Sequence, residues 1–143
     1  MHARQIIQEF LARQCGWMHA KRRDSLASMT DAARRCGLGL LKMSKGLARN
    51  TSLRHRIKSA DRLLSNRHLA EERLGIYRAV ARSVIGAQTR IGLIIDWSDL
   101  LPDISQHVLR AAVVVRGRAF VIYEEVHPTK QYASPSVHRA FME

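Results

Sequence analysis

The spacing of apolar residues changes near residue 90. Before that point, apolar side chains recur three or four positions apart, as Leu53, Ile57 and Ala60 do, which is typical of one face of a helix. After it, the run at 91–95 is rich in β-branched residues and apolar on both faces, which indicates a strand. A chain that carries both patterns in this order is predicted to be α+β, with a helical bundle over residues 1–88 and a sheet over residues 89–143.

The first half is expected to contain a series of helices. Their predicted ranges are 3–14, a second helix capped by Asp24 or Ser25 and ending at 36, a short one within 38–47, one from 53 to about 64, and a longer one ending at Gly86. Ser52 is the expected cap of the fourth helix. Asn66 is expected to stop that helix in the left-handed conformation.

The second half is expected to contain three strands. The first, at 91–95, is predicted to be a central strand that ends at Asp96, followed by a loop at 97–103 that contains Pro102. Strands at 108–115 and 119–126 are joined by a tight turn at Arg116 and Gly117. Ser134 is expected to cap a final helix with Pro135 in its first turn.

Positive charge is concentrated in the first half. Of the net charge of +12, residues 1–90 contribute 19 Lys or Arg against 6 Asp or Glu, and residues 91–143 contribute 5 against 6. A Lys or Arg that neutralises a phosphate releases condensed counterions, so a basic region of this kind is predicted to bind nucleic acid. The predicted DNA-contacting residues lie opposite the apolar stripe of the helix at 53–64 and just beyond it: Arg54, Arg56, Lys58, Arg62 and Arg67. The alternative is a merely solvated helix face.

Several classes of site and location are disfavoured. Only Cys15 and Cys36 are present, without the close spacing of a zinc site or a disulfide framework, and the seven histidines are dispersed. No apolar run is long enough to cross a bilayer, and the first residues lack a signal-peptide core, so we expect no membrane partner and a cytoplasmic location. Phosphate loops and nucleophile motifs are also missing from the sequence.

Asp96 is the carboxylate with the most useful predicted position. A rigid strand that ends in a carboxylate suits metal-dependent chemistry, but the same pattern is typical of an Asp that caps a turn, and the residues alone favour the cap. Asp99 and Asp103 are expected to be caps or solvated charges. Glu124 and Glu125 are expected to end a strand and to point to opposite faces, so they are not a general acid and base pair, although one could face Asp96.

Four segments, taken in order, resemble transposases of the fourth insertion-sequence family. They are WMHAKRR at 17–23, HRIKSADRLLSN at 55–66, LIIDWSD at 93–99 and YEEVHP at 123–128. The combination covers most of the chain and is more specific than any single segment.

This resemblance implies a basic helical DNA-binding region followed by a ribonuclease-H-like catalytic domain. Asp96 matches the first of the three acids, Asp, Asp and Glu, that bind Mg²⁺ or Mn²⁺ in the family. The segments that would carry the other two acids do not occur in this sequence, so the resemblance implies an incomplete, three-stranded start of the catalytic domain. Its implied partner is the double-stranded DNA of transposon ends, and its implied location is the bacterial nucleoid.

Three functions are therefore open at the level of sequence. The first is a cut-and-paste DNA transposase, here a catalytically incomplete part of one. The second is a non-catalytic DNA-binding regulator, derived from a truncated transposase, that occupies element ends or self-associates into inactive mixed oligomers. The third is a structural helical adaptor in which positive charge only maintains solubility.

Overall fold

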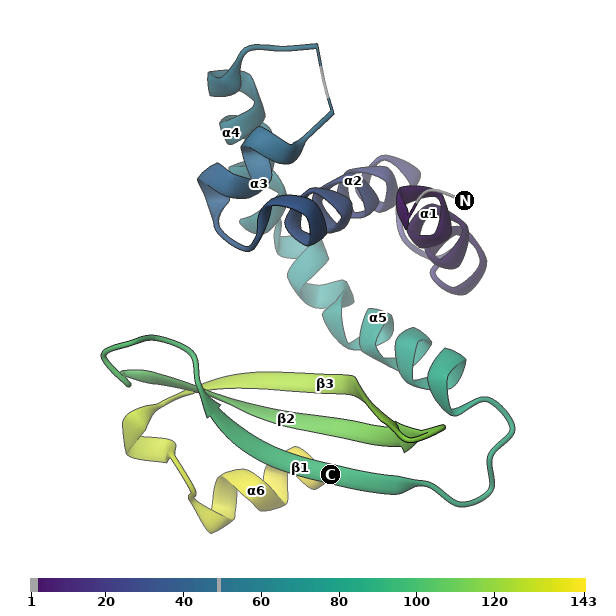
Figure 1. Cartoon of the computed structure of the whole chain (residues 1–143), viewed down its shortest axis with the longest axis vertical. Coiled ribbons are helices and arrows are strands. Elements are labelled where there is room, and N and C mark those ends of the chain that lie inside the picture. The colour runs from purple at the N-terminus through teal and green to yellow at the C-terminus, as the bar shows by residue number, and fades with distance from the viewer. Residues whose placement is uncertain (1–2, 49) are drawn as a thin grey trace. The chain divides into compact units, whose positions relative to one another are not determined.

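The computed structural model describes residues 3–48 and 50–143 (Figure 1). Its elements, in chain order, are α1 (Ala3–Gln14), α2 (Ala20–Cys36), α3 (Leu40–Gly46), α4 (Leu53–Leu64), α5 (Arg67–Ile85), β1 (Gly92–Asp99), β2 (Gln106–Val115), β3 (Arg118–Pro128), the 3-10 turn η1 (Thr129–Gln131) and α6 (Pro135–Met142). This order of helices followed by a sheet confirms the α+β class. None of the helices in the described ranges is long and apolar enough to cross a membrane.

The chain divides into two compact units, residues 1–76 and 77–143. The division falls inside α5, whereas the sequence predicted the end of the helical bundle at residue 88. One reason is that Tyr77, in the second half of α5, packs edge-on against Tyr123 of β3, with ring centroids 5.0 Å apart. The last turns of the helix therefore belong to the core of the sheet-bearing unit.

The first unit is built around α2. This helix packs against α1, α3 and α4, and its apolar face meets those of α3 and α4 in a single cluster. The buried members of the cluster are Met29, Ala32, Met43, Leu47, Ala60 and Leu63. Gly46 lets α3 approach α2 closely, since a Cβ at this position would lie 2.8 Å from the Sγ of Cys36.

Two helix starts in this unit differ from the sequence prediction. α2 begins at Ala20 and not at Asp24 or Ser25, because the backbone amides of Arg22 and Arg23 already bond to the carbonyl of His19. Asn66 does not stop α4 in the left-handed conformation. Its Oδ1 accepts a hydrogen bond from the backbone amide of Leu69, 3.0 Å away, so it caps the start of α5.

The start of α4 is as predicted. Ser52 precedes its first residue, and the serine side chain accepts a hydrogen bond from the backbone amide of His55. This bond satisfies one of the amides that a helix leaves without an internal partner at its first turn.

The second unit contains an antiparallel sheet in the order β1-β2-β3. The prediction that the first strand is central is wrong: β2 is central, and its Leu109 and Val113 are fully buried, whereas Leu93 and Ile94 of β1 remain 45% and 46% exposed. An apolar run with β-branched residues suits any strand, and only pairing decides which strand lies inside. Within residues 3–48 and 50–143, β1 pairs with β2 alone.

The predicted ends of two strands are also wrong. β1 continues past Asp96 to Asp99, because Trp97 and Asp99 still pair with Leu109 and His107. β3 continues past Glu124 and Glu125 to Pro128. A shift in the β2–β3 register between Ala111 and Ala112 marks a bulge in this pair.

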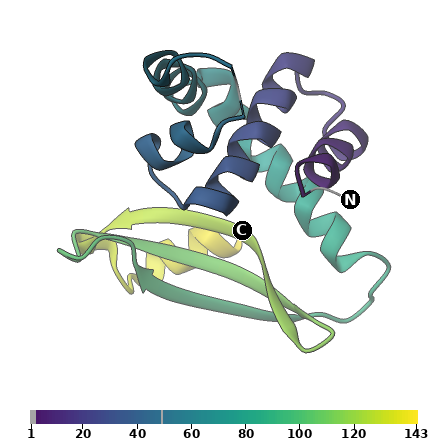
Figure 2. The same cartoon turned by 45° about the horizontal axis from the view of Figure 1, so that its top comes forward.

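The hairpin turn and the last helix are as predicted. Arg116 and Gly117 have φ angles of 51° and 74°, the positive values that a two-residue turn of the primed type needs. Pro135 lies in the first turn of α6, although the Ser134 side chain makes no capping bond. α6 lies along one face of the sheet (Figure 2), where Phe141 packs on Tyr123.

Candidate functional site

Three cations form an exposed row on α4. Arg54, Lys58 and Arg62 follow one another at intervals of four residues and are all exposed, while Ala60 and Leu63 on the other side of the helix are buried. Residues four apart lie one turn along the same helix face, so the three charges point in a similar direction. No carboxylate of the described residues forms an ion pair with any of them. We call Arg54, Lys58 and Arg62 the α4 row.

Arg56 does not belong to this row. Its Nη1 donates to the carbonyls of Lys45 and Leu47, at 3.4 and 3.3 Å, and the side chain is half-buried. Each helical residue is turned by about 100° from the last, which brings Arg56 to the side of Ala60 and Leu63. Arg56 therefore bonds to carbonyls at the end of α3, and its half-buried position differs from the exposed one that the sequence predicted.

Arg67 is exposed at the start of α5. Its Nε lies 3.6 Å from Oε1 of Glu71, four residues later, and both side chains are largely in solvent. An exposed pair of this kind is weak, on the order of 0.5 kcal/mol, so Glu71 reduces the local charge without fixing the arginine.

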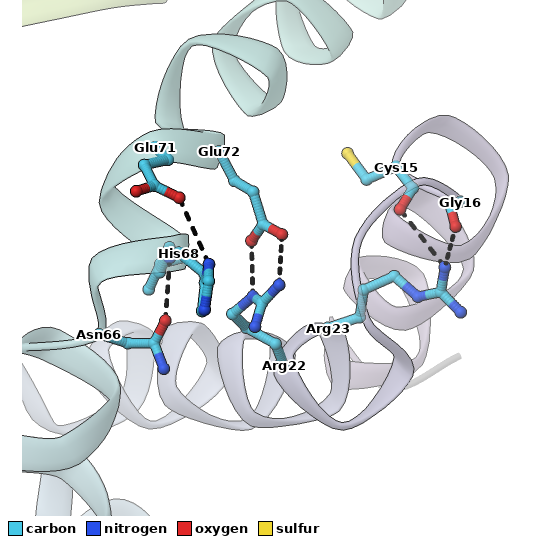
Figure 3. A network of polar contacts seen from close by, with 9 residues as sticks. Cys15, Gly16, Arg22, Arg23, Asn66, His68, Glu71 and Glu72 are labelled. Carbon is cyan, nitrogen blue, oxygen red and sulfur yellow. Dashed lines mark hydrogen bonds and ion pairs between the residues drawn. The ribbon is translucent and has the colours of Figure 1, made fainter.

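Two of the three consecutive bases at 21–23 bind inside the first unit. Arg22 donates from Nε and Nη2 to the two carboxylate oxygens of Glu72, at 2.6 and 2.5 Å, and so joins α2 to α5 (Figure 3). These hydrogen bonds raise the pKa of Arg22. Arg23 donates to the carbonyls of Cys15 and Gly16, which follow α1. Lys21 is exposed and makes no such contact with the part of the chain that the structure describes.

Arg34 and Arg35, near the end of α2, also make internal contacts. Asp31 accepts hydrogen bonds from both guanidinium groups, at 3.4 and 3.0 Å, and Arg35 reaches the carbonyl of Gly46 as well. Burial of Asp31 opposes ionisation, but the two arginines outweigh it and hold the pKa of its carboxyl below the ordinary value. The basic residues of α2 are thus largely occupied by the fold, which leaves the α4 row as the more accessible charge.

Asp96 lies in the middle of β1 and is exposed. It is directly opposite Arg110 of β2, which is in turn opposite Glu124 of β3. Residues directly opposite in a sheet share a face, so the three form an acid–base–acid row, and Nε of Arg110 lies 2.6 Å from Oε1 of Glu124. A mid-strand position removes the interpretation of Asp96 as a turn cap.

The neighbouring acids have separate roles. Asp103 accepts bonds from the hydroxyl and backbone amide of Ser105, which lower the pKa of its carboxyl, so its prediction as a cap is confirmed. Asp99 has a largely exposed side chain, in line with the predicted solvated charge, and its Oδ1 lies 2.9 Å from Nδ1 of the buried His107. Glu125 points away from the face of Glu124 and accepts a bond from the hydroxyl of Tyr123.

The sequence prediction missed a histidine cluster under α6. Nε1 of Trp97 donates to Nε2 of His138 at 2.5 Å, and the ring of His127 lies 5.5 Å from that of Trp97. His107 is paired with His127 across β2 and β3. The predicted turn at residues 116 and 117 fixes which residues of the two strands face each other. Counted from this turn, His107 would lie opposite the residue next to His127, and the bulge shifts the register by the one residue that pairs the two histidines.

The described residues do not supply a metal site. No group of three or more His, Cys, Asp or Glu side chains within 3–48 and 50–143 is arranged to hold a metal ion. Asp96 offers one carboxylate, and the side chain opposite it is a cation. The residues present therefore do not fit a resident Mg²⁺ or Mn²⁺ on their own, since such ions need several oxygen ligands.

No family model matches the chain, and no curated protein and no solved structure matches it significantly. The transposase resemblance of the four segments therefore stays a prediction.

Proposed function

We propose that this chain binds duplex DNA at the ends of a mobile element, as part of a cut-and-paste transposase of the fourth insertion-sequence family. The observation that carries the proposal is the α4 row, three exposed cations on one helix face that the fold leaves without a carboxylate partner among the described residues. Other bases, such as Arg22, Arg35 and Arg56, have internal partners.

The physical basis is the electrostatic attraction of phosphates. A helix advances about 5.4 Å per turn, so the α4 row spreads its three charges over roughly two turns. Each phosphate that these charges neutralise releases counterions, which makes the affinity fall as salt is added. The role implies a working location at the bacterial nucleoid.

The test replaces the α4 row. Arg54→Gln, Lys58→Gln and Arg62→Gln are combined in one protein, and its binding to duplex DNA is titrated at several salt concentrations. The matched control combines Arg13→Gln, Lys42→Gln and Lys130→Gln, three exposed bases elsewhere, so both proteins have the same net charge. We expect the row variant to lose up to about 2.7 from the slope of log affinity against log salt, about 0.9 for each lost phosphate contact, and the control to lose much less.

Two outcomes would reject this function. One is a wild-type chain that does not bind duplex DNA at low salt. The other is equal loss in the row variant and the control, which would mean that only net charge matters.

The finer proposal is that the sheet-bearing unit is the start of a ribonuclease-H-like catalytic domain and that Asp96 is its first metal-binding acid. The resemblance and the exposed position of Asp96 on a rigid strand support it. Because the described residues do not make up a metal site, Asp96 would act only with acids from outside them. In an active transposase that contains this sequence, Asp96→Asn should abolish strand cleavage and preserve DNA binding, whereas Asp61→Asn should preserve both.

A second candidate function is a non-catalytic DNA-binding regulator that occupies element ends or enters inactive mixed oligomers. The pairing of Arg110 with Glu124 favours it, because this pair sets a cation opposite Asp96 and occupies a nearby carboxylate of the same sheet face. Addition of the chain to an active transposase would distinguish the two: a regulator lowers the transposition frequency, and the α4-row variant of it does not.

A further inference from the structure

A polar hollow lies between the start of α2 and the end of α4, inside the first unit. Its volume is about 290 Å³, and the side chains around it include His19, Lys21, Arg22, Ser25, Arg62 and Asn66. A water molecule occupies about 30 Å³ in the liquid, so the hollow has room for a group of several non-hydrogen atoms. The lining residues come from segments about forty positions apart, which only the folded unit brings together.

The charges of the hollow are unequally compensated. Arg22, on its wall, is neutralised by Glu72 at 2.5 Å (Figure 3). Lys21 and Arg62 are exposed, and no carboxylate of the described residues lies within ion-pair distance of either. The hollow therefore carries two uncompensated positive charges from two different helices, together with the hydroxyl of Ser25. This combination suits an anion with several oxygen acceptors.

The hollow is continuous with the surface that the proposed function uses. Arg62 is both the last member of the α4 row and a lining residue of the hollow. A DNA strand that follows Arg54 and Lys58 along α4 would therefore bring its next phosphates to Lys21. The bonds of Arg22 and Arg23 to the fold explain why, of three consecutive bases, Lys21 is the one left for a ligand.

We propose that this hollow binds one phosphate of the DNA backbone between Lys21 and Arg62. The inference rests on the proposed DNA-binding function and adds a second helix to the interface. It assigns Lys21, which lies outside the α4 row, as a phosphate-binding residue, and it has the two cations share a single phosphate.

The experiment is a double-mutant cycle on duplex DNA binding by the full chain. Lys21→Gln should weaken binding several-fold more than Lys42→Gln, an exposed lysine of α3 that serves as the control. The slope of log affinity against log salt concentration measures how many phosphates are lost. The double variant Lys21→Gln/Arg62→Gln should lose about 0.9 of this slope in total, the value for one phosphate. The double variant Lys21→Gln/Arg54→Gln should lose about 1.8 of the same slope, the value for two phosphates.

Several results would overturn the inference. If the wild type binds DNA and Lys21→Gln matches Lys42→Gln, the hollow holds no phosphate, and the α4 row stands without it. If the slope losses of Lys21→Gln and Arg62→Gln add up in the double variant, the two cations bind two separate phosphates and do not share one. Calorimetric titration with inorganic phosphate tests whether the ligand is a free phosphate ion instead of a DNA phosphate. Saturation of the hollow at micromolar phosphate would assign it to the free ion. Helix content by circular dichroism should stay unchanged in every variant. If Lys21→Gln lost helix content, Lys21→Met would take its place in the same comparison.

Discussion

Arg110 lies directly opposite Asp96 in the pairing of β1 with β2. The same guanidinium reaches Glu124 on β3 at 2.6 Å, so one cation stands between two acids on one face of the sheet. Without Arg110, the row would contain the carboxylates of Asp96 and Glu124 and no cation. The arrangement gives Asp96 a cationic neighbour, and it makes Arg110 the centre of the row.

Replacing Arg110 tests the contribution of this row to stability. The side chains of Arg110 and Glu124 are 41% and 33% exposed, so solvent screens their attraction, and we expect Arg110→Ala to lower the free energy of unfolding by about 0.5–1 kcal/mol. Urea denaturation at low and high salt would measure it, with a smaller difference at high salt. Arg118→Ala, an exposed residue of the same hairpin, is the control; an equal effect in both would remove any special role of the row.

The helices and the hairpin were predictable because their signals are local. Apolar spacing, the Ser52 cap and the Arg116–Gly117 turn each depend on residues close together in the sequence. The end of β1 depends on distant pairing. Asp96 interrupts an apolar run, which by itself predicts a strand end, yet the pairing of Asp99 with His107 extends the strand. Nothing in a segment by itself says which strand will be central.

The candidate site was predictable only in part, for a similar reason. Positions 54, 58 and 62 share a helix face, and the sequence pointed to them. Arg56 could have been separated from them by helical rotation, since it is four residues before the buried Ala60. The roles of Arg22 and Lys21 could not have been separated in this way, because the partner of Arg22 is Glu72, fifty residues away.

Gly46 should resist substitution. A Cβ there would lie 2.8 Å from Sγ of Cys36 and 3.1 Å from Cβ of Ala32, so Gly46→Ala forces α3 away from α2. Overpacking of this kind costs about 1–3 kcal/mol. Thermal unfolding would measure it against Gly16→Ala, where the nearest atom is 3.7 Å away. Equal melting temperatures for the two variants would show that the helices separate at little cost.

Trp97 should hold α6 on the sheet. Its Nε1 donates to Nε2 of His138 at 2.5 Å, and Trp97→Phe would remove the donor and leave this acceptor unsatisfied at a partly buried position, at a cost of about 1 kcal/mol. Amide hydrogens of α6 should then exchange several-fold faster. Trp17→Phe, in the first unit, should leave that exchange unchanged. Unchanged exchange in Trp97→Phe would mean that ring packing alone holds the helix.

The two cysteines should differ in reactivity. Cys15 is fully buried, and this burial raises the pKa of its thiol above the ordinary 9.0, whereas Cys36 is exposed. Because the thiolate is the reactive form, a thiol reagent at pH 8 should modify Cys36 first and Cys15 only on unfolding. Mass spectrometry of the Cys15→Ser and Cys36→Ser variants would identify each site. Rapid labelling of the Cys36→Ser protein under native conditions would contradict the buried position of Cys15.

Asp31 should make the first unit sensitive to acid. Arg35 and Arg34 hold the pKa of its carboxyl below the ordinary 3.8. The native state therefore binds this proton more weakly than the unfolded state does. Its stabilising effect is complete above about pH 5 and is lost as the pH falls through 3.8 towards the lower, folded value. Urea midpoints at pH 7 and pH 3 should differ less for Asp31→Asn than for the wild type. Asp61→Asn, which changes an exposed carboxylate of α4, should retain the wild-type difference, and a retained difference in Asp31→Asn would assign the acid sensitivity to other carboxylates.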